Sequence, residues 1–120
     1  MIILYGIPNC DTVKKARAWL TGRAVPYEFY DFKKKGVPAD RLNDWSSALG
    51  WDKLINRQGS TWRKFDALTQ ASAADATGAQ ALVLAHSSVI KRPVVEWGTD
   101  ITVGFDASSW EARLEVRSAL

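Results

Sequence analysis

The residue of this chain with the clearest covalent chemistry is Cys10, its only cysteine. It follows a tight Pro8-Asn9 loop and precedes a predicted helix over residues 11–21, with Asp11 as the predicted N-cap. A cysteine reacts as its thiolate, and the free N–H groups of a helix N-terminus stabilise that anion. Lys14, one helical turn further on, adds a positive charge. These features predict a reactive thiol at Cys10 instead of a small buried hydrophobe.

The predicted elements around Cys10 form a strand, a helix and a second strand. The apolar residues 2–5 end at Gly6, which predicts a short buried strand. The helix over residues 11–21 follows, and residues 26–31 are aromatic and alternating enough for the next strand. A strand, helix and strand in succession predict a parallel pair with a right-handed crossover.

The middle of the chain is predicted to be helical. Lysines 33–35 predict a solvated turn, after which a helix begins at Pro38 and ends at Gly50. Short helical segments then follow to His86, which we expect at a helix end. We therefore expect an all-helical insertion over roughly residues 38–88.

The last part of the chain predicts a hairpin and a helix. Residues 94–97 and 101–103 flank a Gly98-Thr-Asp100 turn, which favours two antiparallel strands. Ser108-Ser-Trp-Glu111 is similar to a capping box that opens a final helix through Arg117. The element order predicts an α/β thioredoxin-like fold, a mixed β-sheet flanked by helices, as one domain over residues 1–120.

Charge and composition exclude several classes of function. The net charge of +3 is too small for a dedicated nucleic-acid binder, so no direct nucleic-acid contact is expected. The apolar start has no basic leader and is too short to enter a membrane, and a single cysteine suits a reducing compartment, so we expect a cytoplasmic protein. His86 is the sole histidine, and no metal site is predicted.

Three segments together resemble the ArsC/Spx family, and within it the YffB branch: Ile7-Pro-Asn-Cys-Asp-Thr-Val-Lys-Lys-Ala16, Ile55-Asn-Arg-Gln-Gly59 and Lys91-Arg-Pro-Val-Val95. The resemblance implies an ArsC-like thioredoxin fold with a helical insertion and thiol chemistry at Cys10. It also implies an anion-binding loop that includes Asn9, Asp11 and Thr12, and a cis-proline at Pro93 beside the cysteine.

The resemblance also points to arginines near the thiol. Arsenate reductases of this family place three arginines around their cysteine, and this sequence matches two of them, Arg57 and Arg92. Where the third would fall, the chain has Val103-Gly-Phe-Asp106, which weakens the case for arsenate as the substrate. Two guanidinium groups suit carboxylates such as those of glutathione.

The predicted function is that of a glutathione-dependent monothiol reductase. Cys10 attacks an oxidised or glutathionylated sulfur, and glutathione, as the reducing co-substrate, releases the mixed disulfide; no bound cofactor is expected. Lys14, Arg57, Arg92 and Pro93 are predicted to bind the substrate together with the loop around Cys10.

Two alternatives stay open. One is an arsenate reductase that works with a glutaredoxin-type protein. The other is a Spx-like regulator that binds RNA polymerase, although this chain has Cys10-Asp-Thr-Val13 where redox-sensing Spx proteins carry Cys-x-x-Cys.

Overall fold

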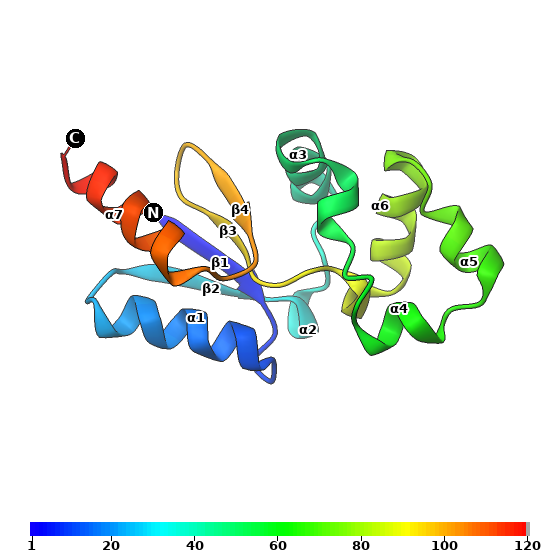
Figure 1. Ribbon diagram of the computed structural model, residues 1–120, viewed down its shortest axis with the longest axis horizontal. Coiled ribbons are helices and arrows are strands. Elements are labelled where there is room, and N and C mark those ends of the chain that lie inside the picture. Colours follow the sequence, from blue (N-terminus) through cyan, green and yellow to red (C-terminus); the bar gives the residue numbers. More distant parts are fainter. Residues whose placement is uncertain (120) are drawn as a thin grey trace.

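The protein is elongated, with a β-sheet and two helices at one end and a group of short helices at the other (Figure 1). A computed structural model describes the backbone of residues 1–119 and the side chains of residues 1–117. Its principal extents are 47 × 27 × 25 Å. No helix within residues 1–119 is both long enough and apolar enough to cross a membrane.

The sheet has four strands in the order β2-β1-β3-β4. They are β1 (Ile2–Gly6), β2 (Tyr27–Asp31), β3 (Val94–Glu96) and β4 (Ile101–Val103). β1 runs parallel to β2, with Leu4 opposite Phe29, and antiparallel to β3, with Leu4 opposite Val95. β3 and β4 form the predicted antiparallel hairpin. The mixed sheet confirms the thioredoxin-like α/β fold.

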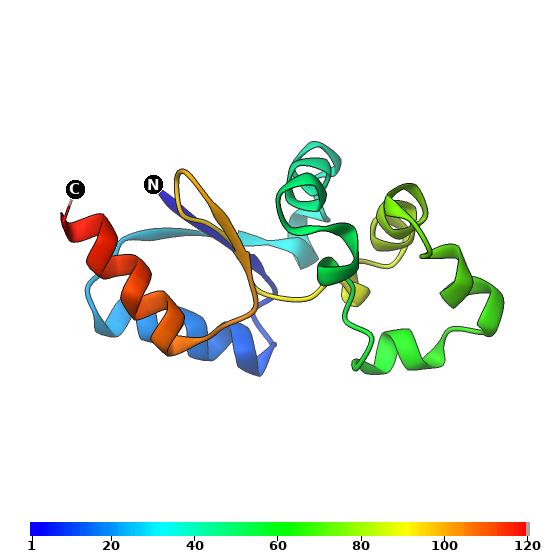
Figure 2. The same cartoon turned by 45° about the horizontal axis from the view of Figure 1, so that its top comes forward.

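One face of the sheet is covered by α1 (Asp11–Gly22) and α7 (Ala107–Ala119). Val13, Ala16 and Leu20 recur at helical spacing on α1 and are fully buried. Trp110 of α7 packs edge-on against Trp97, with ring centroids 5.0 Å apart. Figure 2 shows both helices below the sheet. Because α1 follows β1 and α7 follows β4, the N-terminal end of each helix lies near the C-terminal end of the strand before it.

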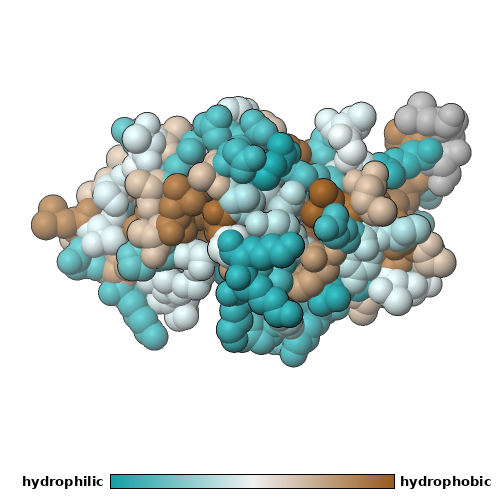
Figure 3. All heavy atoms as spheres, turned by 180° about the vertical axis from the view of Figure 1, so that it is seen from behind, coloured by the Kyte–Doolittle hydropathy of each residue, from teal (hydrophilic) through white to brown (hydrophobic). Residues whose placement is uncertain are grey.

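The helical elements between β2 and β3 build the other core. They are α2 (Phe32–Lys35), α3 (Ala39–Leu49), a 3-10 turn (Trp51–Leu54), α4 (Ser60–Lys64), α5 (Ala67–Ser72), α6 (Ala76–Ala85) and a second 3-10 turn (Ser87–Val89). Tyr5 of β1 and Trp45 of α3 meet in this core with ring centroids 4.7 Å apart. Seen from behind, hydrophilic side chains form a belt across the middle of the molecule, between scattered hydrophobic areas (Figure 3).

Two predicted elements differ from the structure. Lysines 33–35 form the short helix α2 and not a turn, because the Asp31 carboxylate accepts a 2.8 Å hydrogen bond from the Lys33 N–H and caps it. The last helix begins at Ala107, so Ser108 lies inside its first turn and does not open a capping box. Its hydroxyl instead contacts the Asp106 carboxylate at 3.1 Å.

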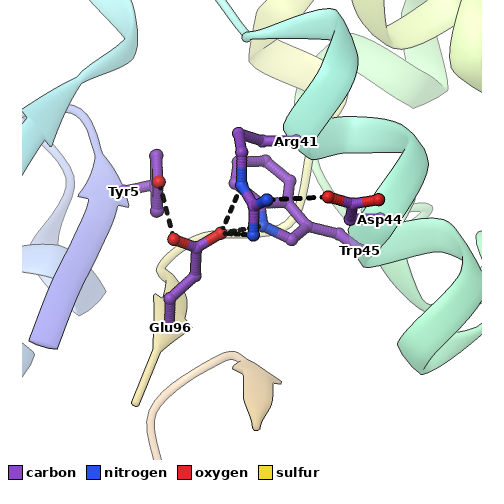
Figure 4. A network of polar contacts seen from close by, with 5 residues as sticks. All are labelled: Tyr5, Arg41, Asp44, Trp45 and Glu96. Atoms are coloured by element: carbon purple, nitrogen blue, oxygen red, sulfur yellow. Dashed lines mark hydrogen bonds and ion pairs between the residues drawn. The ribbon is translucent and has the colours of Figure 1, made fainter. Parts of the chain in front are cut away.

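A polar network joins α3 to the sheet (Figure 4). The Glu96 carboxylate of β3 accepts hydrogen bonds from the Tyr5 hydroxyl and from Trp45 Nε1, each at 2.9 Å, and from the Arg41 guanidinium, with Nε at 2.7 Å. Burial opposes ionisation of Glu96, but the three donors outweigh it and hold the pKa of this carboxyl below its usual value. Burial and the neighbouring carboxylate raise the pKa of Tyr5. Glu96 is therefore an ionised anchor between the sheet and the helical region.

Candidate functional site

Cys10 is the N-cap residue of α1. Its backbone is extended, at φ −107° and ψ 125°, and its carbonyl accepts the Lys14 N–H at 2.9 Å. The predicted N-cap at Asp11 is therefore wrong by one residue, because the chain enters helical geometry only at Asp11, which lies in the first turn. The Cys10 side chain makes no capping hydrogen bond and is partly buried. The thiol is thus free to meet a substrate.

Gly6 sets the distance between the end of β1 and the first turn of α1. A Cβ at this position would lie 2.7 Å from Cγ2 of Val13, which is far inside normal contact. Because Val13 is fully buried and cannot swing away, any larger residue at position 6 would push the helix from the strand. The close approach holds the loop that carries Cys10 at the sheet edge.

The thiol lies in a cavity of about 590 Å³. Four separate segments build its wall: the start of α1, the loop after the first 3-10 turn, the residues before β3, and β4 with the start of α7. The lining residues are Cys10, Thr12, Asn56, Lys91, Arg92, Thr102, Val103, Gly104, Phe105, Asp106, Ser109 and Trp110. The arrangement offers one nucleophile among cationic, hydroxyl and aromatic side chains.

Arg92 lines the same cavity as Cys10, and the peptide bond between Arg92 and Pro93 is cis. Nη1 of Arg92 donates to the carbonyl oxygens of Ser88 at 3.1 Å and Ile90 at 3.3 Å. Its Nε is buried and has no hydrogen-bond partner among residues 1–117. The guanidinium is therefore fixed by backbone groups at the cavity wall, with donor capacity left over.

Arg57 lies elsewhere. Its Nη1 donates to the Asp52 carbonyl at 3.2 Å, and its guanidinium carbon is 5.3 Å from the ring centroid of Trp62. The neighbouring residue in the loop, Asn56, lines the cavity in its place. Of the predicted site residues, the structure brings Cys10, Thr12 and Arg92 together at the cavity, and Pro93 follows Arg92 directly. Asn9, Asp11 and Lys14 are exposed near the thiol and are not part of the lining.

Several lining residues were missed from the sequence. Asn56 and Lys91 stand inside the motifs that carry the family resemblance, which was the available signal for both. Asp106 ends the segment that lacks the third arginine, and the structure shows that this segment does face the thiol. No spacing pattern pointed to Ser109 or Trp110. Within the described part of the chain, no group of three or more His, Cys, Asp and Glu side chains is arranged to hold a metal ion.

The mixed sheet, the cysteine at the start of α1 and the cis peptide bond before Pro93 are the features of a thiol oxidoreductase fold. The model of the ArsC family matches residues 5–113, and the chain belongs to this family. It is 34% identical over 112 residues to an uncharacterised protein of Haemophilus influenzae, which covers 93% of this chain and 97% of the relative.

Two solved structures and a regulator complete the comparison. The chain is 43% identical to the YFFB protein, with a TM-score of 0.89 and coverage of 93% of this chain and 97% of the other. It is 41% identical to an arsenate reductase-related protein from Brucella melitensis, with a TM-score of 0.74 and 92% of each chain covered. It is also similar to the global transcriptional regulator Spx of Streptococcus pyogenes, at 23% identity over 116 residues, 95% of this chain and 85% of the relative.

Proposed function

We propose that the protein is a glutathione-dependent monothiol reductase of the cytoplasm, with Cys10 as its nucleophile. The observation that carries this proposal is the chain's single cysteine at the start of a helix, opening into a cavity with two cationic side chains, Lys91 and Arg92. Helix N–H groups and nearby cations favour the thiolate, the form that attacks a disulfide. With no second cysteine in the chain, the second thiol of the cycle has to come from outside.

The cycle has two exchange steps. The Cys10 thiolate attacks the glutathione sulfur of a glutathionylated substrate; the new S–S bond forms as the old one breaks, and the substrate leaves as its thiolate. A free glutathione thiolate then attacks the glutathione sulfur of the mixed disulfide. This step releases the Cys10 thiolate and one glutathione disulfide. In the net reaction one free glutathione reduces the substrate and leaves paired with the glutathione that the substrate carried.

The charge of the cavity supports glutathione as the partner. Glutathione carries carboxylates, and Arg92 places at the cavity wall a guanidinium whose Nη2 makes no hydrogen bond among residues 1–117. The segment from Val103 to Asp106 faces the thiol and holds no arginine, which counts against arsenate because an oxyanion needs cations on several sides. The arsenate reductase-related and Spx relatives keep arsenate reduction and RNA polymerase binding as the competing functions.

The test is the rate of mixed-disulfide formation with glutathione disulfide, followed by intact mass. Wild type is expected to form a one-to-one adduct and Cys10→Ser none. Arg92→Ala is expected to react about tenfold more slowly, since a charge-assisted hydrogen bond contributes about 1.5–3 kcal/mol and solvent exposure reduces it toward the lower value. Arg63→Ala, which removes an exposed arginine on α4, is the matched control.

Arg57→Ala tests whether Arg57 binds glutathione, as the sequence predicted, or lies outside the site, as the structure indicates. Because its guanidinium lies over Trp62 and not at the cavity, we expect this variant to react at nearly the wild-type rate. If glutathione disulfide forms no adduct while Cys10 reacts with a small uncharged disulfide, the proposal is wrong. A pull-down with RNA polymerase and an arsenate assay then decide between the two competing functions.

A further inference from the structure

The cavity carries charges of both signs. Lys91 and Arg92 stand on the side before β3, and the Asp106 carboxylate stands on the side before α7. Within residues 1–117, neither Lys91 nor Asp106 belongs to an ion pair, whereas Asp100 in the neighbouring hairpin is paired with Arg113. The hydroxyl of Ser108, at 3.1 Å, is the only side-chain partner of Asp106 within the same range. Two opposite charges in the cavity therefore remain available to a ligand.

The fold holds the segments that carry these charges next to each other. The Lys91 N–H donates to the Leu54 carbonyl at 2.8 Å, which ties its backbone to the helical region. Its Cε lies 3.6 Å from the position that a Cβ at Gly104 would occupy, so the lysine stem passes over the loop that leads to Asp106. Gly104 has φ +85° and donates its N–H to the Pro93 carbonyl at 2.8 Å. The loop is thus fixed to the segment before β3 that carries Lys91.

We propose that this cavity selects thiols that carry both a carboxylate and an ammonium group, with Lys91 facing the carboxylate and Asp106 facing the ammonium. The inference rests on the proposed function and makes it more specific, because the γ-glutamyl end of glutathione carries this pair of groups. A cavity built for a simple anion would gain nothing from Asp106, since a carboxylate repels another anion. Asp106 is therefore a specificity-determining residue, favouring a free amine and disfavouring oxyanions and purely acidic thiols.

The experiment compares two disulfides that differ only in the amine. Glutathione disulfide keeps its ammonium groups, and N-acetylated glutathione disulfide has lost them. The measurement is the rate of adduct formation at Cys10, by intact mass, with each disulfide in separate reactions. For wild type we expect glutathione disulfide to react about tenfold faster than the acetylated form, the effect of one charge-assisted contact that solvent partly screens.

Three variants localise the effect. Asp106→Asn is expected to react with both disulfides at similar rates, and asparagine preserves the residue type that favours a helix start, so α7 should be kept. Lys91→Gln is expected to slow both disulfides by a similar factor. Glu28→Gln changes the net charge equally on the exposed side of β2, far along the chain from the lining residues, and should keep the wild-type preference. Far-ultraviolet circular dichroism and the reaction with uncharged 2-hydroxyethyl disulfide check folding and the thiol itself.

The outcomes separate the two proposals. If wild type reacts equally fast with both disulfides, or if Asp106→Asn keeps the wild-type preference, the ammonium site is refuted while the glutathione reductase function stands. If neither glutathione disulfide reacts and the uncharged disulfide does, the proposed function itself fails. A preference that disappears in Asp106→Asn and persists in Glu28→Gln supports the inference.

Discussion

Replacing Glu96 by alanine should weaken the attachment of the helical region to the sheet. The carboxylate accepts from Tyr5, Trp45 and Arg41, and its removal leaves two buried donors without an acceptor. A hydrogen bond to a charged group contributes about 1.5–3 kcal/mol, but the bonds from these three side chains share one carboxylate and do not add. Breaking a buried pair costs about 3–5 kcal/mol, and we expect the lower part of that range because about a third of the Arg41 side chain is exposed.

The assay is chemical and thermal unfolding, followed by far-ultraviolet circular dichroism and tryptophan fluorescence. For a chain of this length, a loss of about 3 kcal/mol corresponds to a fall in Tm of roughly 10–15 °C. Glu115→Ala, which removes an exposed glutamate on α7, is the control and should change the free energy of unfolding by less than about 0.5 kcal/mol. A loss below about 1 kcal/mol for Glu96→Ala would refute the role assigned to the network.

The same carboxylate gives this prediction a pH dependence. The pKa of Glu96 is lower in the folded chain than its ordinary value of 4.5, so the folded state binds its proton less readily than the unfolded state. The stabilisation is therefore complete above about pH 4.5 and is lost as the pH falls through the folded pKa. The difference in unfolding free energy between wild type and Glu96→Gln should shrink on acidification. A difference that stays constant between neutral and acidic pH would contradict the assignment.

Three further predictions concern packing and the thiol. Gly78→Ala should lower the free energy of unfolding by about 2–4 kcal/mol in denaturant melts, because its Cβ would lie 1.8 Å from the Ser72 carbonyl oxygen; an unchanged or raised midpoint would contradict this. Lys14→Ala should slow the alkylation of Cys10 by about twofold at low salt and not at high salt, since Lys14 is exposed and its charge is screened; equal rates at low salt would remove Lys14 from thiol activation. Arsenate should not be reduced with glutathione and glutaredoxin present, because residues 103–106 supply no guanidinium; robust turnover in that coupled assay would overturn this expectation.

The sheet and its first helix followed directly from local patterns. Residues 2–5 and 27–31 lie in parallel strands, and the spacing of Val13, Ala16 and Leu20 gave the buried face of α1 correctly. These elements were predictable because their burial repeats at the period of a single helix or strand. The boundary at Cys10 was wrong by one residue, because Asp11 has the side chain of a typical N-cap while the backbone places Cys10 there.

The cavity was not predictable in the same way, because its lining comes from segments up to a hundred residues apart. Asn56 and Arg57 are neighbours in one loop, yet the first lines the cavity that holds the thiol and the second lies against Trp62. Which of the two residues lines the cavity depends on the packing of the helical region. The local spacing of residues in the sequence does not indicate it. The Glu96 network was equally hidden, although one charged residue between Val95 and Trp97 was a signal that a buried partner was needed.

The absence of an arginine between Val103 and Asp106 does not leave that wall of the cavity without a cation. Lys91 extends over Gly104 from the segment before β3, so a positive charge reaches this wall from the residue next to Arg92. A flexible lysine ammonium differs from a planar guanidinium, because it cannot donate two parallel hydrogen bonds to two oxygens of one anion in a fixed bidentate geometry. The Asp106 carboxylate in the same loop places a negative charge next to this positive one. Such a wall favours a ligand that carries its own balanced pair of charges over a compact oxyanion, which is the chemical reason to look for thiol peptides before arsenate.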